Sequence, residues 1–170
     1  RMSLMTLSRQ DAVWVLEFHG SETQKGRFEN RFNPDFVAQF NKALDEIEKD
    51  KSCAALVTTS SGKIYSNGLD LAWMGENPKD VDDFMASVHR LLHRVMFLPI
   101  PSIAAINGHA FAGGFMLALC HDYRVMREDR GYLCLNEIDL GMNLTHGMNA
   151  LVRAKIDPYH LRAVLLTGKR

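Results

Sequence analysis

The stretch Pro101–Asp122, PSIAAINGHAFAGGFMLALCHD, places a short apolar strand, a glycine-containing turn and an apolar helix in succession. Ser102–Ile106 is a continuous apolar run typical of a buried strand, and Gly113-Gly114 opens the helical run Phe115–Cys120. The start of a helix presents unpaired N–H groups and the positive end of the helix dipole, and glycine lets a ligand approach that backbone closely. The turn therefore predicts a site for an anion or a developing oxyanion, with a purely structural strand-to-helix turn as the alternative.

Nucleotide-binding and serine-hydrolase motifs are incomplete in this sequence. Gly108 and Gly113 have the spacing of a phosphate-binding loop, but Gly114-Phe115 stands where that loop needs Lys-Ser or Lys-Thr. The dinucleotide pattern G-x-G-x-x-G is absent. Ile64 replaces the first glycine of the G-x-S-x-G motif around Ser66, which argues against a serine hydrolase.

Neither a metal site nor a disulfide is predicted. His89 and His93 have the i, i+4 spacing of two metal ligands on a helix, but no third ligand is evident nearby, so we expect a solvated helix face. The three cysteines, Cys53, Cys120 and Cys134, are odd in number, widely spaced and set in apolar surroundings. This pattern is typical of buried free thiols in a reducing compartment.

The composition indicates a chain that can bury a sizeable core. It has 170 residues, of which 46% are hydrophobic, and we expect one domain over residues 1–170. Twenty basic residues offset twenty acidic ones, which gives no general electrostatic reason to expect nucleic acid or an anionic membrane as partner. No apolar run approaches the length of a membrane span.

Strands alternate with long helices along the chain, which predicts an α/β architecture built from repeated β-to-α turns. The predicted strands are Val13–Phe18, Ala54–Thr59, Ser102–Ile106, Tyr123–Met126 and Tyr132–Leu135. Helices are predicted from Asn33-Pro34 to a charged end at Lys51, and over Val81–Phe97, Phe115–Cys120, Leu151–Ile156 and Pro158–Thr167. Polar loops are expected between Gly20 and Asn30 and over Gly141–Gly147, and a second glycine turn follows the strand at Ala54–Thr59.

Glu137 lies between the apolar stretches Tyr132–Leu135 and Ile138–Leu140, where an acid is unexpected unless it is paired or functional. Burial would raise its pKa and make it a usable proton carrier. A buried, salt-bridged structural glutamate is the alternative.

Three segments together resemble the crotonase superfamily, that is, the enoyl-CoA hydratase/isomerase family. They are Ser66–Leu71 (SNGLDL), Pro101–Ala110 (PSIAAINGHA) with Gly113-Gly114, and Glu137 before Leu140-Gly141. The resemblance implies a spiral of β-β-α turns, from which the family's C-terminal helices are missing in this chain. It also implies an acyl-CoA thioester as ligand and an oxyanion hole made by the backbone amides of Leu69 and Gly113.

The resemblance also implies an activity. Family hydratases carry two catalytic glutamates, and the first of these positions is Met116 in this chain, whereas Glu137 matches the second. The chain is thus more similar to the Δ3,Δ2-enoyl-CoA isomerases of fatty-acid β-oxidation, in which a single carboxylate moves a proton between C2 and C4. A hydratase, a thioester hydrolase and a non-catalytic CoA- or protein-binding scaffold are the alternatives.

Further expectations concern the ligand and the setting. We expect CoA to lie across a locally basic loop and the first glycine turn, contacting Lys25, Arg27, Arg31, Ser66, Asn67, Gly68, Asp70 and Leu71, with Gly114 and Met116 also at the substrate site. No separate cofactor is expected, because coenzyme A is part of the substrate. By resemblance we also expect a homo-oligomer, either a trimer or a hexamer made of trimers, in the peroxisome, with the mitochondrial matrix as the alternative.

Overall fold

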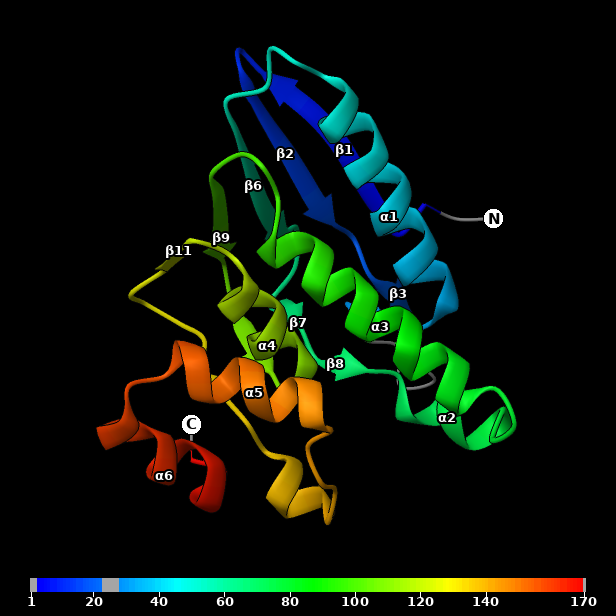
Figure 1. Ribbon diagram of the computed structural model, residues 1–170, viewed down its shortest axis with the longest axis vertical. Coiled ribbons are helices and arrows are strands. Elements are labelled where there is room, and N and C mark those ends of the chain that lie inside the picture. The colour runs from blue at the N-terminus through cyan, green and yellow to red at the C-terminus, as the bar shows by residue number, and fades with distance from the viewer. Residues whose placement is uncertain (1–2, 23–27, 170) are drawn as a thin grey trace.

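The computed structural model in Figure 1 describes residues 3–22 and 28–169 and contains a large and a small sheet. The large sheet has the order β1-β2-β6-β9-β11, in which β1 is antiparallel to β2 and the other neighbours are parallel. The small parallel sheet has the order β12-β10-β7, and two short ribbons pair β3 with β4 and β5 with β8. The strands are β1 (Met5–Gln10), β2 (Val13–Phe18), β3 (Ser21–Glu22), β4 (Phe28–Glu29), β5 (Arg31–Phe32), β6 (Ala55–Ser60), β7 (Ile64–Ser66), β8 (Gly68–Leu69), β9 (Ser102–Ile106), β10 (His109–Phe111), β11 (Tyr123–Met126) and β12 (Leu133–Cys134).

Helices complete a repeating pattern of strand, strand and helix. The passages β6–β7–α3, β9–β10–α4 and β11–β12–α5 each place one strand in the large sheet, one in the small sheet and then a helix. This repetition confirms the predicted α/β spiral of β-β-α turns. The helices are α1 (Pro34–Lys49), α2 (Leu71–Glu76), α3 (Val81–Met96), α4 (Gly113–Cys120), the 3₁₀ turn η1 (Glu137–Leu140), α5 (His146–Lys155) and α6 (Pro158–Thr167).

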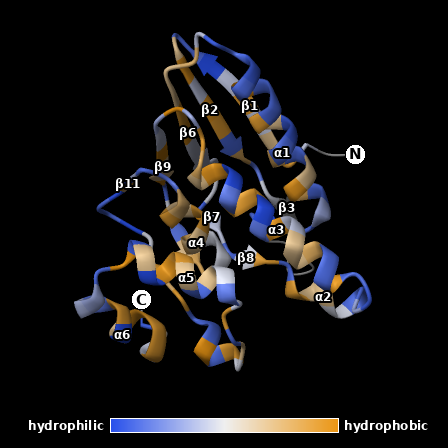
Figure 2. Ribbon diagram, viewed as in Figure 1, coloured by the Kyte–Doolittle hydropathy of each residue, from blue (hydrophilic) through white to orange (hydrophobic). Residues whose placement is uncertain are grey.

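Helix α1 forms where its capping residues and apolar spacing predict it. The Asn33 side chain accepts a hydrogen bond from Phe36 N at 3.0 Å, and Pro34 occupies the first turn, where its missing N–H costs nothing. Figure 2 shows the hydrophobic and hydrophilic bands that alternate along this helix. Its buried side chains recur at helical spacing and are Phe36, Val37, Phe40, Ala43, Leu44 and Ile47.

Helix α4 differs from α1 because all eight of its residues are buried. It packs against α3, α5 and the ends of β7, β8 and β10. A helix enclosed on every side needs no polar face, which explains the uninterrupted apolar sequence from Phe115 to Cys120. All three cysteines are buried, as predicted, and none of them forms a disulfide with another described residue.

Several short elements were not predicted. Strand β1 was missed, β10 lies where a turn was expected, and the β3–β4 ribbon lies within the predicted loop from Gly20 to Asn30. Helix α2 was also missed, although Asp70 caps it by accepting from Trp73 N at 3.2 Å. Helix α5 starts at His146, before the predicted Leu151, because the Thr145 side chain accepts from Met148 N and caps it there.

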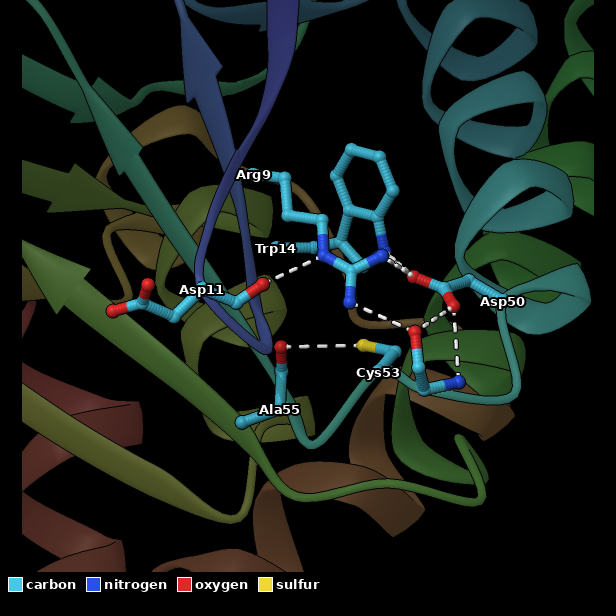
Figure 3. Close-up of polar contacts among 7 residues, drawn as sticks. Arg9, Asp11, Trp14, Asp50, Cys53 and Ala55 are labelled. Carbon is cyan, nitrogen blue, oxygen red and sulfur yellow. Dashed lines mark hydrogen bonds and ion pairs between the residues drawn. The ribbon is translucent and has the colours of Figure 1, made fainter.

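A polar cluster connects the end of α1 to the β1–β2 hairpin (Figure 3). Asp50 accepts hydrogen bonds from Arg9 at 2.7 Å and from the indole N–H of Trp14 at 2.9 Å. The N–H and hydroxyl of Ser52 donate to the other oxygen of the same carboxylate. Both oxygens of Asp50 are therefore engaged. In Figure 1 this cluster lies at the opposite end of the molecule from η1.

Candidate active site

The two glycine turns predicted from the sequence lie in direct contact. A Cβ atom added to Gly68 would lie 2.6 Å from the backbone nitrogen of Gly113, and one added to Gly114 would overlap the carbonyl of Ser66. Gly68 also has φ +73°, a backbone conformation that residues with a side chain rarely adopt. Only glycine fits at positions 68 and 114, and the contact holds β8 against the start of α4.

The geometry of this contact leaves two backbone N–H groups directed away from the neighbouring ladders. Phe32 is the ladder partner of Leu69, and Asp70 N donates to Phe32 O at 2.8 Å. Because successive N–H groups of a strand point to opposite sides, the N–H of Leu69 points away from β5. Gly113 is the first residue of α4, where N–H groups have no partner within the helix. The predicted oxyanion donors thus come from neighbouring segments.

Ala112, which precedes α4, has φ 49° and ψ −125°, an unusual conformation for a residue with a side chain. Three hydrogen bonds hold it: its N–H donates to Cys134 O at 2.8 Å, and its carbonyl accepts from Phe115 N and Met116 N. The sequence gives no signal for this residue, because alanine rarely adopts positive φ. Its conformation turns the chain from β10 into α4 and so sets the direction of the Gly113 N–H group.

A cavity of about 380 Å³ lies beside these N–H groups. Its lining is mainly apolar, and among the described residues that line it Glu137 is the only carboxylic acid. The lining residues are Asn67, Leu69, Leu71, Met74, Met85, Phe111, Ala112, Gly113, Asn136, Glu137, Leu140, Met142, Asn143, Leu144, Thr145 and Met148. The structure therefore brings Leu69, Gly113 and Glu137 together around one space.

Glu137 enters the cavity from the first position of η1, shortly after β12. Its Oε2 atom is buried and has no hydrogen-bond partner within the described part of the chain. Burial raises the pKa of this carboxyl above its ordinary value. Among the described residues it forms no ion pair, so nothing in that part of the chain supports the alternative of a salt-bridged structural glutamate.

The predicted contact residues of the first glycine turn fall into two groups, those that line the cavity and those that shape the local backbone. Asn67 and Leu71 line the cavity, as does Leu69. Ser66 is fully buried, and its hydroxyl donates to Asn30 O at 2.8 Å and accepts from Gly68 N at 3.1 Å, so it shapes the turn. Asp70 is occupied as the cap of α2.

Arg31, Gly114 and Met116 are not among the residues that line the cavity. Arg31 pairs with Glu29 at 2.7 Å, and Glu29 also accepts from the Asn67 side chain at 2.9 Å. Lys25 and Arg27 lie outside the described residues. Gly114 and Met116 are buried in the core and do not line the cavity, because α4 presents only its first residue to that space. Substrate contact by Gly114 and Met116 stays a prediction, which the lining of this cavity does not support.

Sequence reasoning also missed Asn136. Its Oδ1 atom is buried without a hydrogen-bond partner in the described ranges, and its residue lines the cavity beside Glu137. Buried polar atoms normally have partners, so unsatisfied oxygens at a cavity indicate a place where a ligand binds. The one feature of the sequence that could have identified Asn136 is its position directly before Glu137.

The two histidines on α3 have other partners among the described residues. His89 Nε2 is hydrogen-bonded to Thr145 Oγ1 at 2.8 Å, and the His93 ring stacks on Phe97 with centroids 4.5 Å apart. No group of three potential metal-ligating side chains occurs among the residues that the structure describes. His89 is only half-exposed, so the prediction of a solvated face is correct for His93 alone. None of the described helices combines the length and apolar character needed to cross a membrane.

Comparison with known proteins identifies the family to which this fold is similar. The chain matches the enoyl-CoA hydratase/isomerase family over residues 10–170. It is 39% identical to enoyl-CoA delta isomerase 2, peroxisomal, and 35% identical to enoyl-CoA delta isomerase 1, peroxisomal, both of Arabidopsis thaliana. Each alignment covers 98% of this chain, and 70% and 68% of the relative. The crystal structure of the enoyl-CoA hydratase from Geobacillus kaustophilus superposes with a TM-score of 0.86 at 23% identity, covering 99% of this chain and 62% of that one.

The spiral of β-β-α turns is the fold of the crotonase class. The chain belongs to the enoyl-CoA hydratase/isomerase family. It spans about two thirds of the length of these relatives.

Proposed function

We propose that this protein is a Δ3,Δ2-enoyl-CoA isomerase, which moves the double bond of an unsaturated fatty acyl-CoA from C3 to C2 in fatty-acid β-oxidation. The observation that carries the proposal is Glu137, the single carboxylic acid among the described residues of the cavity, with a buried oxygen that no described protein group engages. The Arabidopsis relatives named enoyl-CoA delta isomerase support the same activity.

The proposed mechanism is a proton shuttle within one acyl chain. The Glu137 carboxylate removes a proton from C2, and the electron pair of that C–H bond moves into a dienolate with negative charge on the thioester oxygen. The N–H groups of Leu69 and Gly113 stabilise that oxygen, each contributing roughly 3 kcal/mol. Glu137 then returns the proton to C4, which leaves the double bond between C2 and C3 and regenerates the carboxylate.

The environment of Glu137 suits a base that must also act as an acid. A carboxylate that accepts hydrogen bonds from the protein is a weaker base, because those bonds stabilise its charged form. The Oε2 atom of Glu137 lacks such bonds within the described chain, and its pKa is raised by burial. A pKa nearer to neutrality makes both removal and return of the proton easier. No separate cofactor enters this reaction.

Hydration is the alternative within the same family, and Met116 argues against it. Hydration needs a positioned water as well as a proton carrier, and a thioether accepts hydrogen bonds only weakly and does not titrate. The Met116 side chain is moreover fully buried. Among the described residues of the cavity there is no second carboxylic acid that could hold the water for Glu137.

The cellular setting and assembly are part of the proposal. Two of the relatives carry the word peroxisomal in their names, which supports a peroxisomal location, with the mitochondrial matrix as the alternative. A homo-oligomer of the trimeric type is proposed from the family resemblance alone. The CoA moiety would bind beside the first glycine turn, where Asn67 and Leu71 meet the cavity.

A direct comparison of two activities tests the function. The protein is mixed with 3-hexenoyl-CoA and with 2-hexenoyl-CoA, and double-bond migration and 3-hydroxyhexanoyl-CoA formation are followed separately. We expect isomerisation to exceed hydration by at least about 100-fold, the usual contribution of one acid/base group. Comparable hydration would contradict the isomerase, and CoA binding without either reaction would indicate a non-catalytic scaffold.

A further inference from the structure

A buried chain of side-chain hydrogen bonds crosses the core behind the glycine turns. Thr58 Oγ1 on β6 is 2.7 Å from the hydroxyl of Tyr65 on β7 and 2.9 Å from Nε2 of His121, the residue that ends α4. All three side chains are fully buried. Polar groups in such a place are costly unless each is satisfied, so the chain is a specific feature of this core.

The hydrogen bond that His121 makes to the backbone, together with its neutral ring, determines which group donates in each hydrogen bond of this series. Its Nδ1 atom is 2.9 Å from the carbonyl oxygen of Leu117, which can only accept, so Nδ1 carries the proton and Nε2 is an acceptor. The Thr58 hydroxyl must then donate to His121, and the Tyr65 hydroxyl must donate to Thr58. Burial lowers the pKa of His121 to about 4, in agreement with a neutral ring.

The chain of hydrogen bonds connects the two elements that carry the proposed oxyanion donors. Tyr65 is in β7, and the backbone continues from it through Ser66 to Leu69. His121 ends the helix that begins at Gly113. The glycine contact at positions 68 and 113 joins these elements at the cavity, and Thr58 joins them at the other end of α4. Helix α4 is thereby attached to β7–β8 at both of its ends.

We propose that Thr58, Tyr65 and His121 are positioning residues that hold the N–H groups of Leu69 and Gly113 at the separation needed to bind one thioester oxygen. This inference rests on the proposed function, because it gives these three hydrogen-bonded side chains the role of positioning the oxyanion donors of that reaction. A rotation or shift of α4 relative to β8 would displace one donor from the other. Such displacements lower turnover while substrate binding, which depends on the whole cavity, changes little.

The test replaces the central hydroxyl. Thr58→Val keeps the shape of the side chain but leaves the Tyr65 hydroxyl and His121 Nε2 without partners, whereas Thr58→Ser keeps the hydroxyl. We expect kcat per folded molecule to fall about tenfold in Thr58→Val with KM within about twofold of the wild type, and Thr58→Ser to restore most of kcat. The double variant Thr58→Val/Tyr65→Phe removes one unsatisfied group, so it should recover stability without recovering kcat.

Ser102→Ala is the matched control. Ser102 is buried, and its hydroxyl donates a hydrogen bond to Asp122, the residue directly after His121. This bond connects the end of α4 to β9 and not to β7–β8. We expect this variant to lose stability while keeping kcat. Equal loss of kcat in Ser102→Ala and Thr58→Val, or normal kcat in folded Thr58→Val, would overturn the inference.

A second readout does not depend on turnover. The NMR amide shifts of Leu69 and Gly113 should change in Thr58→Val and stay near the wild-type values in Ser102→Ala. Unchanged shifts in Thr58→Val would overturn the inference, even if the wild-type protein is an active isomerase. An inactive wild-type protein whose Thr58→Val variant shows the shift changes would instead contradict the proposed function and leave the positioning role supported.

Discussion

Asp50 and Glu137 are both carboxylates at the end of a helical segment, yet their surroundings are opposite. Asp50 ends α1 and accepts from Arg9, Trp14 and Ser52. These bonds, the Ser52 hydroxyl first, hold its pKa below the usual value. Glu137 begins η1, its Oε2 atom has no partner among the described residues, and burial raises its pKa.

The difference supports the proposal that Glu137 has a role in chemistry, whereas Asp50 has a structural one. Folding favours charged groups whose hydrogen bonds are complete, as at Asp50. A desolvated carboxylate oxygen without a partner costs stability, and such an oxygen beside a cavity supports the proposed use of Glu137 in chemistry. Substitutions at the two residues should therefore differ in their effects on turnover, on the pH dependence of stability and on ligand affinity.

The largest effect is expected for Glu137→Gln. The amide has almost the same shape but cannot exchange the proton, so turnover should fall by at least about 100-fold while CoA binding stays nearly intact. Steady-state kinetics with a 3-enoyl-CoA and calorimetric titration with CoA measure the two effects. Asp50→Asn is the matched control, which should melt at a lower temperature with normal turnover per folded molecule. Near-normal turnover in Glu137→Gln would exclude Glu137 as the acid/base.

The pH dependence of stability should have opposite signs at the two residues. Because the pKa of folded Glu137 is raised, the native state binds its proton more tightly than the unfolded chain, and stability falls as pH rises from the ordinary value of 4.5 through the raised pKa. Because the pKa of Asp50 is lowered from 3.8, its stabilisation is present above that value and is lost as pH falls through the lowered pKa.

Thermal melts of the wild type and both variants from about pH 3 to about pH 8 measure these slopes. Glu137→Gln should melt as high as the wild type or a few degrees higher at neutral pH, and the difference should vanish in acid. The turnover of the wild type should fall as pH drops through the raised pKa of Glu137, since only the carboxylate removes a proton. A midpoint at or below 4.5 would contradict a raised pKa.

The smallest effect concerns the basic loop. Replacing Lys25, Arg27 and Arg31 together by alanine should weaken CoA binding by about threefold to tenfold at low salt, and less at high salt, because dissolved ions screen the attraction between cations and the CoA phosphates. Turnover at saturating substrate should not change. The control is Arg9→Ala, which removes a cation at the Asp50 end of the molecule. Equal CoA affinity in the triple variant and the wild type would refute the contribution of this loop.

Elements whose signals are local could be predicted from residue order alone. The capping residues and apolar spacing of α1, the apolar run of β9 and the glycines of both turns each depend on neighbours in the chain, so their positions were predicted closely. Short strands such as β10 have no such signal, because three residues become a strand only when distant residues pair with them. Glu137 was identified as a candidate by its apolar flanks and by the family resemblance.

Packing between distant segments determined how these parts act on one another. In the folded chain Gly68 contacts Gly113, Glu137 has an oxygen without a partner among the described residues, and Met116 is enclosed in the core. The fold also joins Thr58 to His121, 63 positions further along the chain. The distance between two residues, the burial of a side chain and the number of its hydrogen bonds all depend on atoms from several distant segments at once. Residue order along one segment therefore could not supply them, and tertiary packing did.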